Sequence, residues 1–362
     1  MISNNKVIVA MSGGVDSSVA ALFYRNLGAE VVGVTLRLRA GIYPGADGCV
    51  SEQDERHAAQ VAERLGIPHV ILDFSADFLE SVLRPCWDEF ARGRTPNPCT
   101  LCNPRIKFGM LLNYANRIGA GLIATGHYAR SVEDNGIWRI CRGGDQAKDQ
   151  TYFLFGLPQS MVARIRFPLG EMSKTEVRRM ACEAGLVTHD KRDSQDTCFL
   201  IPGESFQESL RKLFAAKPRR GRFLDMSGRI LGEHDGIHQF TLGQRKGLGV
   251  ALGKPAYVAA VAGDTGAVTV TTDENDLMAD TFQVAELNWQ DDVVPSQPFR
   301  TLIQVRYRSL PMPGMVIPGP SGLNAEVRLD APLRAITPGQ AAVFYRDDIL
   351  LGGGYITEVC KL

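Results

Sequence analysis

The stretch "KVIVAMSGGVDSSVAALFYRNLG", residues 6–28, restricts the fold of this chain more than any other segment. It reads as a short apolar strand, a turn with two adjacent glycines, and a helix with apolar side chains at helical spacing that ends at Gly28. A second strand-like run, residues 30–38, follows directly. Because a strand, a helix and a strand in this order form a βαβ unit, we expect a parallel sheet with helices on both faces.

The turn after the first strand, "SGGVDSS", has the residues that a phosphate-binding loop needs. Gly13 and Gly14 allow a sharp turn and a close approach to an anion, and the N-terminus of the next helix offers free N–H groups. Ser12 and Ser17 add hydroxyl donors. Asp16 would repel a phosphate unless a cation bridges them, which favours Mg2+ bound together with a nucleotide. The structural alternative is a glycine-rich turn with a serine cap and no ligand.

The order of strand and helix patterns changes along the chain. Helices alternate with strands up to about residue 200, and the helix of residues 173–185 begins with a capping box formed by Ser173 and Glu176. From about residue 204, short strand-like segments are separated by glycine and proline turns. We therefore predict an α/β fold class with three domains. These are a parallel-sheet N-terminal domain of residues 1–203, a small β-rich central domain of residues 204–275, and a C-terminal β-barrel of residues 276–362.

Composition limits the class of protein and its partners. The 40 basic and 40 acidic residues cancel, so a nucleic acid must be bound by a local patch such as residues 211–222, which can equally be a solvated surface. The eight cysteines are too few for a disulfide scaffold. No apolar run approaches about 18 residues, and the N-terminus lacks a secretory signal. These features predict a cytoplasmic protein with reduced thiols and no membrane partner.

Two cysteines, Cys99 and Cys102, lie between prolines in "RTPNPCTLCNPRIKF". A Cys-x-x-Cys pair can be a redox pair, half of a zinc site, or part of a sulfur-handling active site. A zinc site needs two more ligands, and no strand leads into the motif as a thioredoxin-like pair would require. The cysteines outside the candidate sites are expected to pack as small hydrophobic side chains. They are Cys49, Cys86, Cys141, Cys182 and Cys360.

Six motifs in one order carry a resemblance to a known family. They are "AMSGGVDSS", "RTPNPCTLCNPRIKF", "ATGHYAR", "KDQTYFL", "DSQDTCF" and "FTLGQRKGLGV". The first resembles the loop of the ATP pyrophosphatase superfamily, whose members cleave ATP between the α- and β-phosphates to adenylate an oxygen atom. The whole set, over the entire chain, resembles the bacterial tRNA-specific 2-thiouridylases.

This resemblance implies an adenine nucleotide hydrolase-like first domain, ATP and Mg2+ as cofactors, and tRNA as the substrate. The reaction would adenylate the C2 oxygen of the wobble uridine, flipped out of its stack, and replace that oxygen by sulfur with release of AMP and pyrophosphate. The sulfur would come from a persulfide donor protein. Two alternatives stay open: an ATP pyrophosphatase-type ligase for a small carboxylate or amide, and a non-catalytic RNA-binding protein.

The resemblance also implies roles for individual residues. Cys102 would be the catalytic nucleophile and Cys198 the persulfide carrier, with a disulfide between them after each turnover. The nucleotide would be bound by Ala10, Met11, Ser12, Gly13, Gly14, Val15, Asp16, Ser17, Leu36 and Gly126. The target base would face Asn97, Pro98 and Cys99, and the tRNA would contact His127, Lys148, Asp149, Gln150, Arg306, Tyr307 and Gln340.

Six of these seven tRNA-contacting residues also have a structural interpretation. His127 can be a packed histidine, residues 148–150 an ordinary polar turn, and Arg306 with Tyr307 an exposed face of the barrel. Residues 240–250 are expected to form a glycine-rich hairpin whose residues 244–246 face RNA or an active-site lid.

One position departs from the family, since Cys99 is frequently Asp there. The change puts the acid/base step in doubt, and Cys99, Cys102 and Cys198 together can hold an iron–sulfur cluster with one open iron. In the persulfide route both reacting thiols need activation, because a free thiol with a pKa of about 8.5 is only a few per cent thiolate at neutral pH. Lys107, Arg105 or a cation bound to phosphate could provide it.

Overall fold

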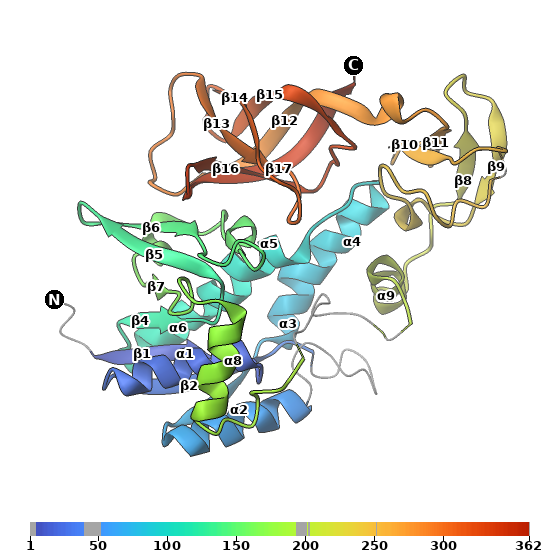
Figure 1. Cartoon of the computed structure of the whole chain (residues 1–362). Helices are drawn as coiled ribbons and strands as arrows, with labels where there is room; N and C mark the ends of the chain where they lie inside the picture. Colours follow the sequence, from blue (N-terminus) through green and yellow to red (C-terminus); the bar gives the residue numbers. More distant parts are fainter. Residues whose placement is uncertain (1–4, 40–51, 193–200, 202, 251, 362) are drawn as a thin grey trace.

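The computed structural model describes residues 5–39, 52–192, 201, 203–250 and 252–361 (Figure 1). The N-terminal part is a parallel sheet covered by helices, the middle part is a small β-sheet, and the C-terminal part is a closed barrel. In Figure 1 the barrel lies above the parallel-sheet domain, and the middle sheet lies to the right. This arrangement confirms the predicted fold class. The domain boundaries at 203/204 and 275/276 stay a prediction.

The N-terminal sheet has five strands in the order β3-β2-β1-β4-β7, all paired in parallel. The chain adds β2 and β3 on one side of β1 and then β4 and β7 on the other, so the topology switches between β1 and β4. In such sheets ligands bind at the carboxyl ends of the strands beside the switch point. The strands are β1 (Lys6–Ala10), β2 (Glu30–Arg37), β3 (His69–Asp73), β4 (Leu122–Ala124) and β7 (Ile165–Arg166).

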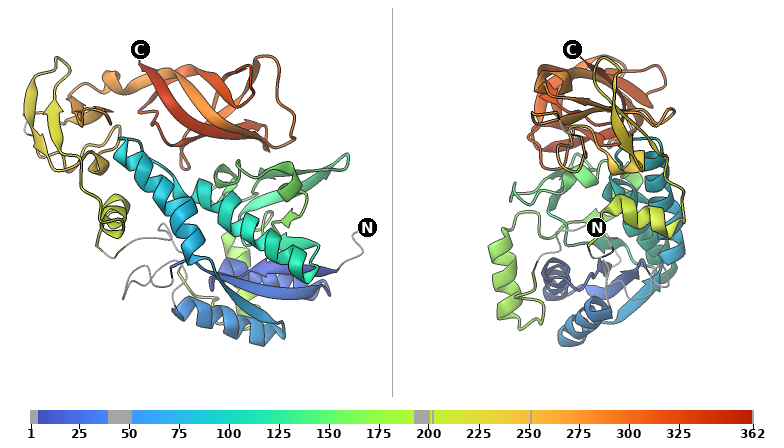
Figure 2. Two further views of the ribbon diagram at one scale, coloured as in Figure 1. Left: turned by 180° about the vertical axis from the view of Figure 1, so that it is seen from behind. Right: turned by 90° about the vertical axis from the view of Figure 1, so that its right-hand side faces the viewer.

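Both faces of this sheet are buried, because neighbouring residues of β1 point into different cores. Val7 and Val9 pack in one core with side chains of α1, α2 and α8, whereas Ile8 packs in the other with side chains of α4 and α6. Figure 2 shows these helices on the two sides of the sheet. They are α1 (Val15–Asn26), α2 (Glu52–Leu65), α4 (Arg84–Ala91), α6 (Gly109–Ile118) and α8 (Lys174–Glu183).

Shorter helical segments complete this domain. The predicted capping box of α8 is confirmed, since the Ser173 side chain accepts from the Glu176 backbone and the Glu176 side chain accepts from Ser173. Two π-helical turns, η1 and η2, flank α4 and α5 in the chain; such turns are frequent at functional sites. The short segments are α3 (Ser75–Phe78), η1 (Leu79–Leu83), α5 (Pro98–Cys102), η2 (Asn103–Phe108), η3 (Thr151–Phe153) and α7 (Gln159–Val162).

The middle sheet has the strand order β10-β11-β8-β9 and follows helix α9. The predicted hairpin of residues 240–250 is wrong, because these residues form consecutive turns without a strand. Gly243, Gly247 and Gly249 have φ angles of 77°, 75° and 69°, which interrupt an extended backbone. The elements are α9 (Phe206–Leu213), β8 (Gly221–Leu224), β9 (Ile230–His234), η4 (Ile237–Gln239), β10 (Tyr257–Val261) and β11 (Val268–Thr271).

The C-terminal barrel has the strand order β12-β15-β14-β13-β16-β17 and is closed by pairing of β12 with β17. A hairpin of the N-terminal domain, β5 (Ala129–Asp134) and β6 (Ile137–Arg142), extends this sheet through the pair Cys141 and Ile349. Strands of the N-terminal domain and of the barrel therefore form one continuous sheet. The barrel elements are η5 (Glu274–Leu277), β12 (Met278–Trp289), β13 (Phe299–Gln304), β14 (Met312–Pro318), β15 (Asn324–Arg334), β16 (Ala341–Arg346) and β17 (Ile349–Lys361).

Burial of the cysteines matches the sequence prediction only in part. Cys86 and Cys141 are buried as expected, but Cys182 and Cys360 are exposed, because α8 and β17 bury other side chains and turn these two outward. Cys49 lies outside the described residues. None of the helices in the described ranges is long and apolar enough to cross a bilayer.

Candidate active site

The loop between β1 and α1 is a compact turn held by its own hydroxyl groups. Gly13 has a φ angle of 71°, and a Cβ atom there would lie 2.2 Å from the backbone oxygen of Asp54, so only glycine fits. The carbonyl of Gly14 accepts from the hydroxyls of Ser17 at 3.1 Å and Ser18 at 2.8 Å. Hydroxyl groups of α1 thus hold the loop at the carboxyl end of β1, directly before the N-terminus of α1, where an anion can bind.

The carboxylate of Asp16 is neutralised by a lysine that the sequence did not single out. The Lys174 Nζ atom lies 2.7 and 2.8 Å from the two Asp16 oxygens, and the Tyr128 hydroxyl donates to Oδ1 at 2.9 Å. A Mg2+ ion on Asp16 would therefore compete with Lys174 for the same oxygens. The phosphates of a nucleotide in the loop would give negative partners to both Mg2+ and the Lys174 ammonium group. The residues therefore fit a nucleotide bound with Mg2+.

A second lysine, Lys191, supports the other side of the loop. Its Nζ atom donates to the Gly13 carbonyl at 2.9 Å, forms an ion pair with Asp54, and lies 3.3 Å from Nδ1 of His57. Lys174 and Lys191 lie more than 150 residues after the loop, so no local pattern in the sequence links them to it.

The end of β4 approaches the same loop. A Cβ atom on Gly126 would lie 2.7 Å from the carbonyl carbon of Asp16 and 2.8 Å from the backbone nitrogen of Ser17. The next residue, His127, shares a hydrogen bond of 2.7 Å between Nδ1 and the Thr125 hydroxyl. Burial, and then the charge of Lys107, lowers the pKa of His127 well below its usual range. His127 is therefore a neutral imidazole at physiological pH.

The helix α5 carries Cys99 and Cys102 one turn apart. The Asn97 side chain caps it by accepting from the Cys99 N–H at 3.1 Å, and the Asn103 side chain donates to the Cys99 carbonyl at 3.0 Å. The barrel also contacts this helix, because the Tyr355 hydroxyl donates to the Thr100 hydroxyl oxygen at 3.2 Å. The cysteine helix is thus fixed at both ends and against the barrel.

Both thiols of this helix resist ionisation in the described state. Burial raises the pKa of Cys102 to about 11, while the charge of Lys107 and a hydrogen bond from its backbone N–H act in the opposite direction. Burial also raises the pKa of Cys99, again opposed by Lys107. Arg105 donates instead to the Ser81 carbonyl at 2.8 Å. Of the two cationic side chains that the sequence offered as activators, Lys107 is the one that acts on these thiols.

Lys107, in η2, is a charge that affects both the cysteine helix and the end of β4. Its charge acts on Cys99, Cys102 and His127, and His127 follows Gly126, whose backbone packs against Asp16. The ring of His127 packs on that of Phe108 in η2, with 5.8 Å between centroids, so the end of β4 contacts both the loop and the segment that continues the cysteine helix. Cys198 lies outside the described residues. Among the residues that are described, no group of three or more His, Cys, Asp or Glu side chains could hold a metal ion.

A cavity of about 420 Å³ lies where the three predicted domains meet. The Gln340 side chain donates to the Thr95 carbonyl at 2.7 Å, and the Thr95 hydroxyl donates to that of Thr241 at 3.1 Å. Arg306 lines the same cavity, and burial followed by the charge of Arg334 lowers its pKa. Two predicted tRNA-contacting residues, Arg306 and Gln340, are thus brought together, and Gln244 lies beside them.

The other predicted tRNA-contacting side chains are partly engaged inside the protein. The Asp149 side chain is only 7% exposed and pairs with Arg142. The Gln150 side chain accepts from the Tyr128 N–H at 3.0 Å. The ring of Tyr307 packs on that of Phe153 with 4.3 Å between centroids. Their contacts with tRNA stay a prediction.

The basic run of residues 211–222 divides into two parts. Arg211 and Lys212 form ion pairs with Glu208 and Glu204, within and beside α9. Arg219 and Arg220 are exposed, and the contact of Arg220 with Asp235, at 3.5 Å, involves two side chains that are at least 80% exposed. Lys217 and Arg222 of the same run are exposed as well, so residues 217–222 offer charge that a polyanion could reach.

Comparison with known protein families gives matches to three consecutive parts of the chain. Three family models match it: "tRNA methyl transferase HUP domain" over residues 5–202, "tRNA methyl transferase PRC-barrel domain" over residues 208–272, and "Aminomethyltransferase beta-barrel domain" over residues 279–356.

Curated relatives match along nearly the full length. The tRNA-specific 2-thiouridylase MnmA of Carboxydothermus hydrogenoformans is 43% identical, with 99% of each chain covered. The protein of the same name from Acidithiobacillus ferrooxidans is 43% identical over 98% of this chain and 99% of its own. That of Trichormus variabilis is 44% identical over the same shares.

Proposed function

The chain belongs to the family of the tRNA-specific 2-thiouridylases, and from that premise we propose that it replaces the 2-oxygen of a tRNA uridine by sulfur in an ATP-dependent reaction. The observation that carries the proposal is that the end of β4 contacts the SGGVDSS loop through Gly126 and the segment that continues the cysteine helix through His127, whose ring packs on Phe108. A ligase for a small carboxylate needs the loop but not the cysteines, and a non-catalytic RNA-binding protein needs neither.

In this proposal ATP is bound by residues 10–17 together with Leu36 and Gly126. Support comes from the loop held by its serine hydroxyls, the helix N-terminus that follows it, and the close approach of Gly126. Mg2+ would be held by Asp16 and would neutralise charge on the phosphates. We assign Lys174 to the same site, because it already supplies the positive charge that Asp16 requires.

The uridine is activated through its C2 oxygen, which attacks the α-phosphate of ATP while pyrophosphate leaves. Asn97, Pro98 and Cys99, at the capped start of α5, would orient the base. His127, as a neutral imidazole, can take part in proton exchange with the substrate but brings no positive charge to the site. Adenylation changes a very poor leaving group into AMP, which the incoming sulfur can displace.

The sulfur arrives as a persulfide on Cys198. Its outer sulfur becomes bonded to C2 and AMP leaves, while the Cys102 thiolate bonds to the inner sulfur and the S–S bond of the persulfide breaks. The transferred sulfur is thereby reduced and the two cysteines are oxidised to a Cys102–Cys198 disulfide, which an external thiol reductant must reduce. With a pKa of about 11, Cys102 needs closer contact with a positive charge, and Lys107 is the group available.

An iron–sulfur cluster on Cys99, Cys102 and Cys198 is the competing use of the cysteines. Of its three ligands, Cys99 and Cys102 lie one turn apart on α5, and Cys198 lies outside the described residues. The proposal also includes the three domains as predicted from the sequence, a persulfide donor protein as partner, a tRNA anticodon as the site of modification, and a cytoplasmic location.

The test is mass analysis of tRNA nucleosides after incubation with the protein, ATP, Mg2+ and a persulfide donor, with pyrophosphate measured in parallel. We expect one oxygen replaced by sulfur at an anticodon uridine, and pyrophosphate release that depends on tRNA. An added methyl group would support the transfer that the family-model descriptions name. Absence of tRNA-dependent pyrophosphate would support a binding protein, and full turnover by Cys198→Ser would support a ligase.

A further inference from the structure

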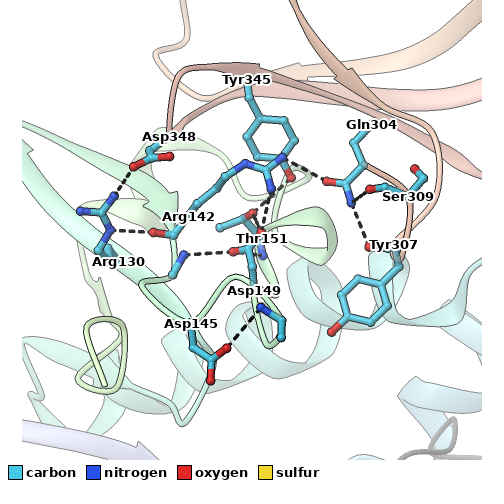
Figure 3. A network of polar contacts seen from close by, with 12 residues as sticks. Arg130, Arg142, Asp145, Asp149, Thr151, Gln304, Tyr307, Ser309, Tyr345 and Asp348 are labelled. Carbon is cyan, nitrogen blue, oxygen red and sulfur yellow. Dashed lines mark hydrogen bonds and ion pairs between the residues drawn. The ribbon is translucent and has the colours of Figure 1, made fainter. Parts of the chain in front are cut away.

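A buried glutamine, Gln304, holds the turn that follows strand β13 of the barrel. Gln304 is 5% exposed, and its Nε2 atom lies 2.8 Å from the carbonyl oxygen of Tyr307 and 3.0 Å from that of Ser309 (Figure 3). The same atom lies 3.1 Å from the carbonyl oxygen of Arg306. A side-chain amide has two N–H donors, so the three carbonyls share them. The amide therefore adds to the backbone hydrogen bond of this turn, in which the Ser309 N–H donates to the Arg306 carbonyl at 3.1 Å.

The orientation of this amide is set by Arg142, from strand β6 of the N-terminal domain. The Arg142 guanidinium donates to Oε1 of Gln304 at 3.3 Å and lies over the Tyr345 ring, 3.9 Å from its centroid. Because Arg142 only donates, it keeps the amide oxygen on its own side and turns the amide nitrogen toward the carbonyls. A reversed amide would place an oxygen against three other oxygens.

Arg142 is in turn fixed by the turn that precedes η3. Its guanidinium lies 3.4 Å from Oδ2 of Asp149, whose carboxylate also accepts from the Gly143 N–H at 3.1 Å and the Thr151 hydroxyl at 2.8 Å. The Thr151 hydroxyl is 3.1 Å from the Tyr345 hydroxyl in the barrel. Residues 148–151 and 305–309 are thus joined across the domain boundary by one buried network, drawn in Figure 3.

We propose that Gln304, oriented by Arg142, is a positioning residue that prepares the turn of residues 305–309 for tRNA. The inference rests on the proposed function and adds how the contacting side chains are held. The Arg306 guanidinium donates to the carbonyls of Arg334 and Ala335 in the three-domain cavity, and Tyr307 packs on Phe153. Gln304 fixes the backbone that carries Arg306 and Tyr307. The conformational entropy lost on tRNA binding is therefore smaller than for a mobile turn.

The experiment compares Gln304→Met with Gln290→Met. Gln290 is a matched control, because it is 1% exposed and its amide also holds carbonyls across the same domain boundary, those of Phe155 at 3.2 Å and Leu157 at 2.7 Å. Both variants should lower the melting temperature. Only Gln304→Met should raise the Kd and KM for tRNA, by about tenfold, while kcat at saturating tRNA and ATP affinity stay near wild type.

A second pair tests the role of Arg142. Arg142→Gln should weaken tRNA binding, whereas Arg139→Gln, which removes the ion pair of the same strand with Asp291, should not. The double variant Arg142→Gln/Gln304→Met should lose less affinity than the sum of the single losses, because both act on one turn.

Wild-type tRNA affinity in Gln304→Met, equal weakening in Gln290→Met, or strictly additive losses in the double variant would each overturn the positioning role. If the wild-type protein binds and thiolates tRNA in the same assays, the proposed function survives such a result. Failure of the wild type to bind tRNA would overturn both.

Discussion

At the scale of single residues, the ion pair between Asp16 and Lys174 balances the negative charge of the loop carboxylate. Replacing Asp16 by Asn keeps the size of the side chain, removes the carboxylate that would hold Mg2+, and leaves Lys174 without that charge partner. We expect tRNA-dependent pyrophosphate release to fall by about a hundredfold, equivalent to about 2.7 kcal/mol of transition-state stabilisation. Affinity for tRNA, measured by filter binding, should stay near wild type.

Lys174→Met should weaken ATP binding. The double variant of Lys174→Met with Asp16→Asn should lose less transition-state stabilisation than the sum of the two single losses. Pyrophosphate release at the wild-type rate by Asp16→Asn would remove this carboxylate from the reaction.

The pKa of Cys102 gives a prediction about reactivity. Only the thiolate reacts with iodoacetamide, and burial raises the pKa of this thiol to about 11. The alkylation rate of Cys102 in the free protein should therefore still be rising by about tenfold per pH unit between about pH 8 and 10.

Removal of the nearby charge by Lys107→Met should raise that pKa further and slow labelling at every pH, since Lys107 lowers it now. The measurement is peptide mass analysis after timed labelling. A rate that levels off near pH 8.5, the usual value for a thiol, would contradict the buried environment described for Cys102.

The third residue-scale prediction separates the cysteines. Cys102→Ser and Cys198→Ser should abolish thiolation, whereas Cys99→Asp, which restores the residue frequent in the family, should keep measurable activity. If iron-free protein works with a persulfide donor, an obligatory cluster is ruled out. Strict dependence of activity on reconstituted iron, with loss of visible absorbance in each Ser variant, would instead make Cys99 a ligand.

At the scale of elements, the close approach of β4 to α1 depends on Gly126. Gly126→Ala adds a Cβ atom within 2.8 Å of the backbone of Asp16 and Ser17, so the loop must move. We expect ATP affinity to fall by about tenfold or more while the far-ultraviolet circular dichroism stays unchanged. Gly232→Ala in β9, where the nearest atom lies at 3.9 Å, is the control and should bind ATP normally. Equal ATP affinity in both variants would contradict the role given to Gly126.

Sequence predicted the elements whose signals are local. The strand, glycine turn and helix of residues 6–28 and the capping box at Ser173 are observed because each depends on neighbours within one or two turns. The hairpin of β5 and β6 was missed although "DNG" is a strong turn signal, with Asn135 at φ 52° and Gly136 at φ 83°. Its pairing with the barrel joins residues more than 200 positions apart, which no local pattern reports.

The site follows the same rule. The sequence singled out the glycine-rich loop and the two cysteines of α5 but not Lys174, because its partner Asp16 lies 158 residues away. For Asp149, the sequence did not report that the carboxylate is buried, and its contact with tRNA stays a prediction. Burial and long-range pairing were the properties that the sequence did not report.

At the scale of the whole molecule, a chain with no net charge must bind RNA through a local surface. The exposed residues Arg219 and Arg220 form such a surface beside the middle sheet. Changing both to Gln should weaken tRNA binding. It should also reduce the dependence of affinity on salt, by about one unit of slope for each phosphate that the variant no longer neutralises.

The control changes the net charge equally elsewhere, by Arg56→Gln and Arg179→Gln, which remove exposed pairs within α2 and α8. Binding titrations at several salt concentrations measure both variants. An unaltered slope in the Arg219/Arg220 variant would indicate that this surface is only solvated.

The central claim is that the nucleotide loop and the cysteine helix form one site that activates and then thiolates the same uridine. One measurement tests it most directly: nucleoside mass analysis and pyrophosphate release from one tRNA preparation with the wild type, Asp16→Asn and Cys102→Ser. We predict that Cys102→Ser releases pyrophosphate but makes no 2-thiouridine, and that Asp16→Asn makes both products about a hundredfold more slowly than the wild type. Thiolated tRNA from Cys102→Ser, or from Asp16→Asn at the wild-type level, would contradict the account.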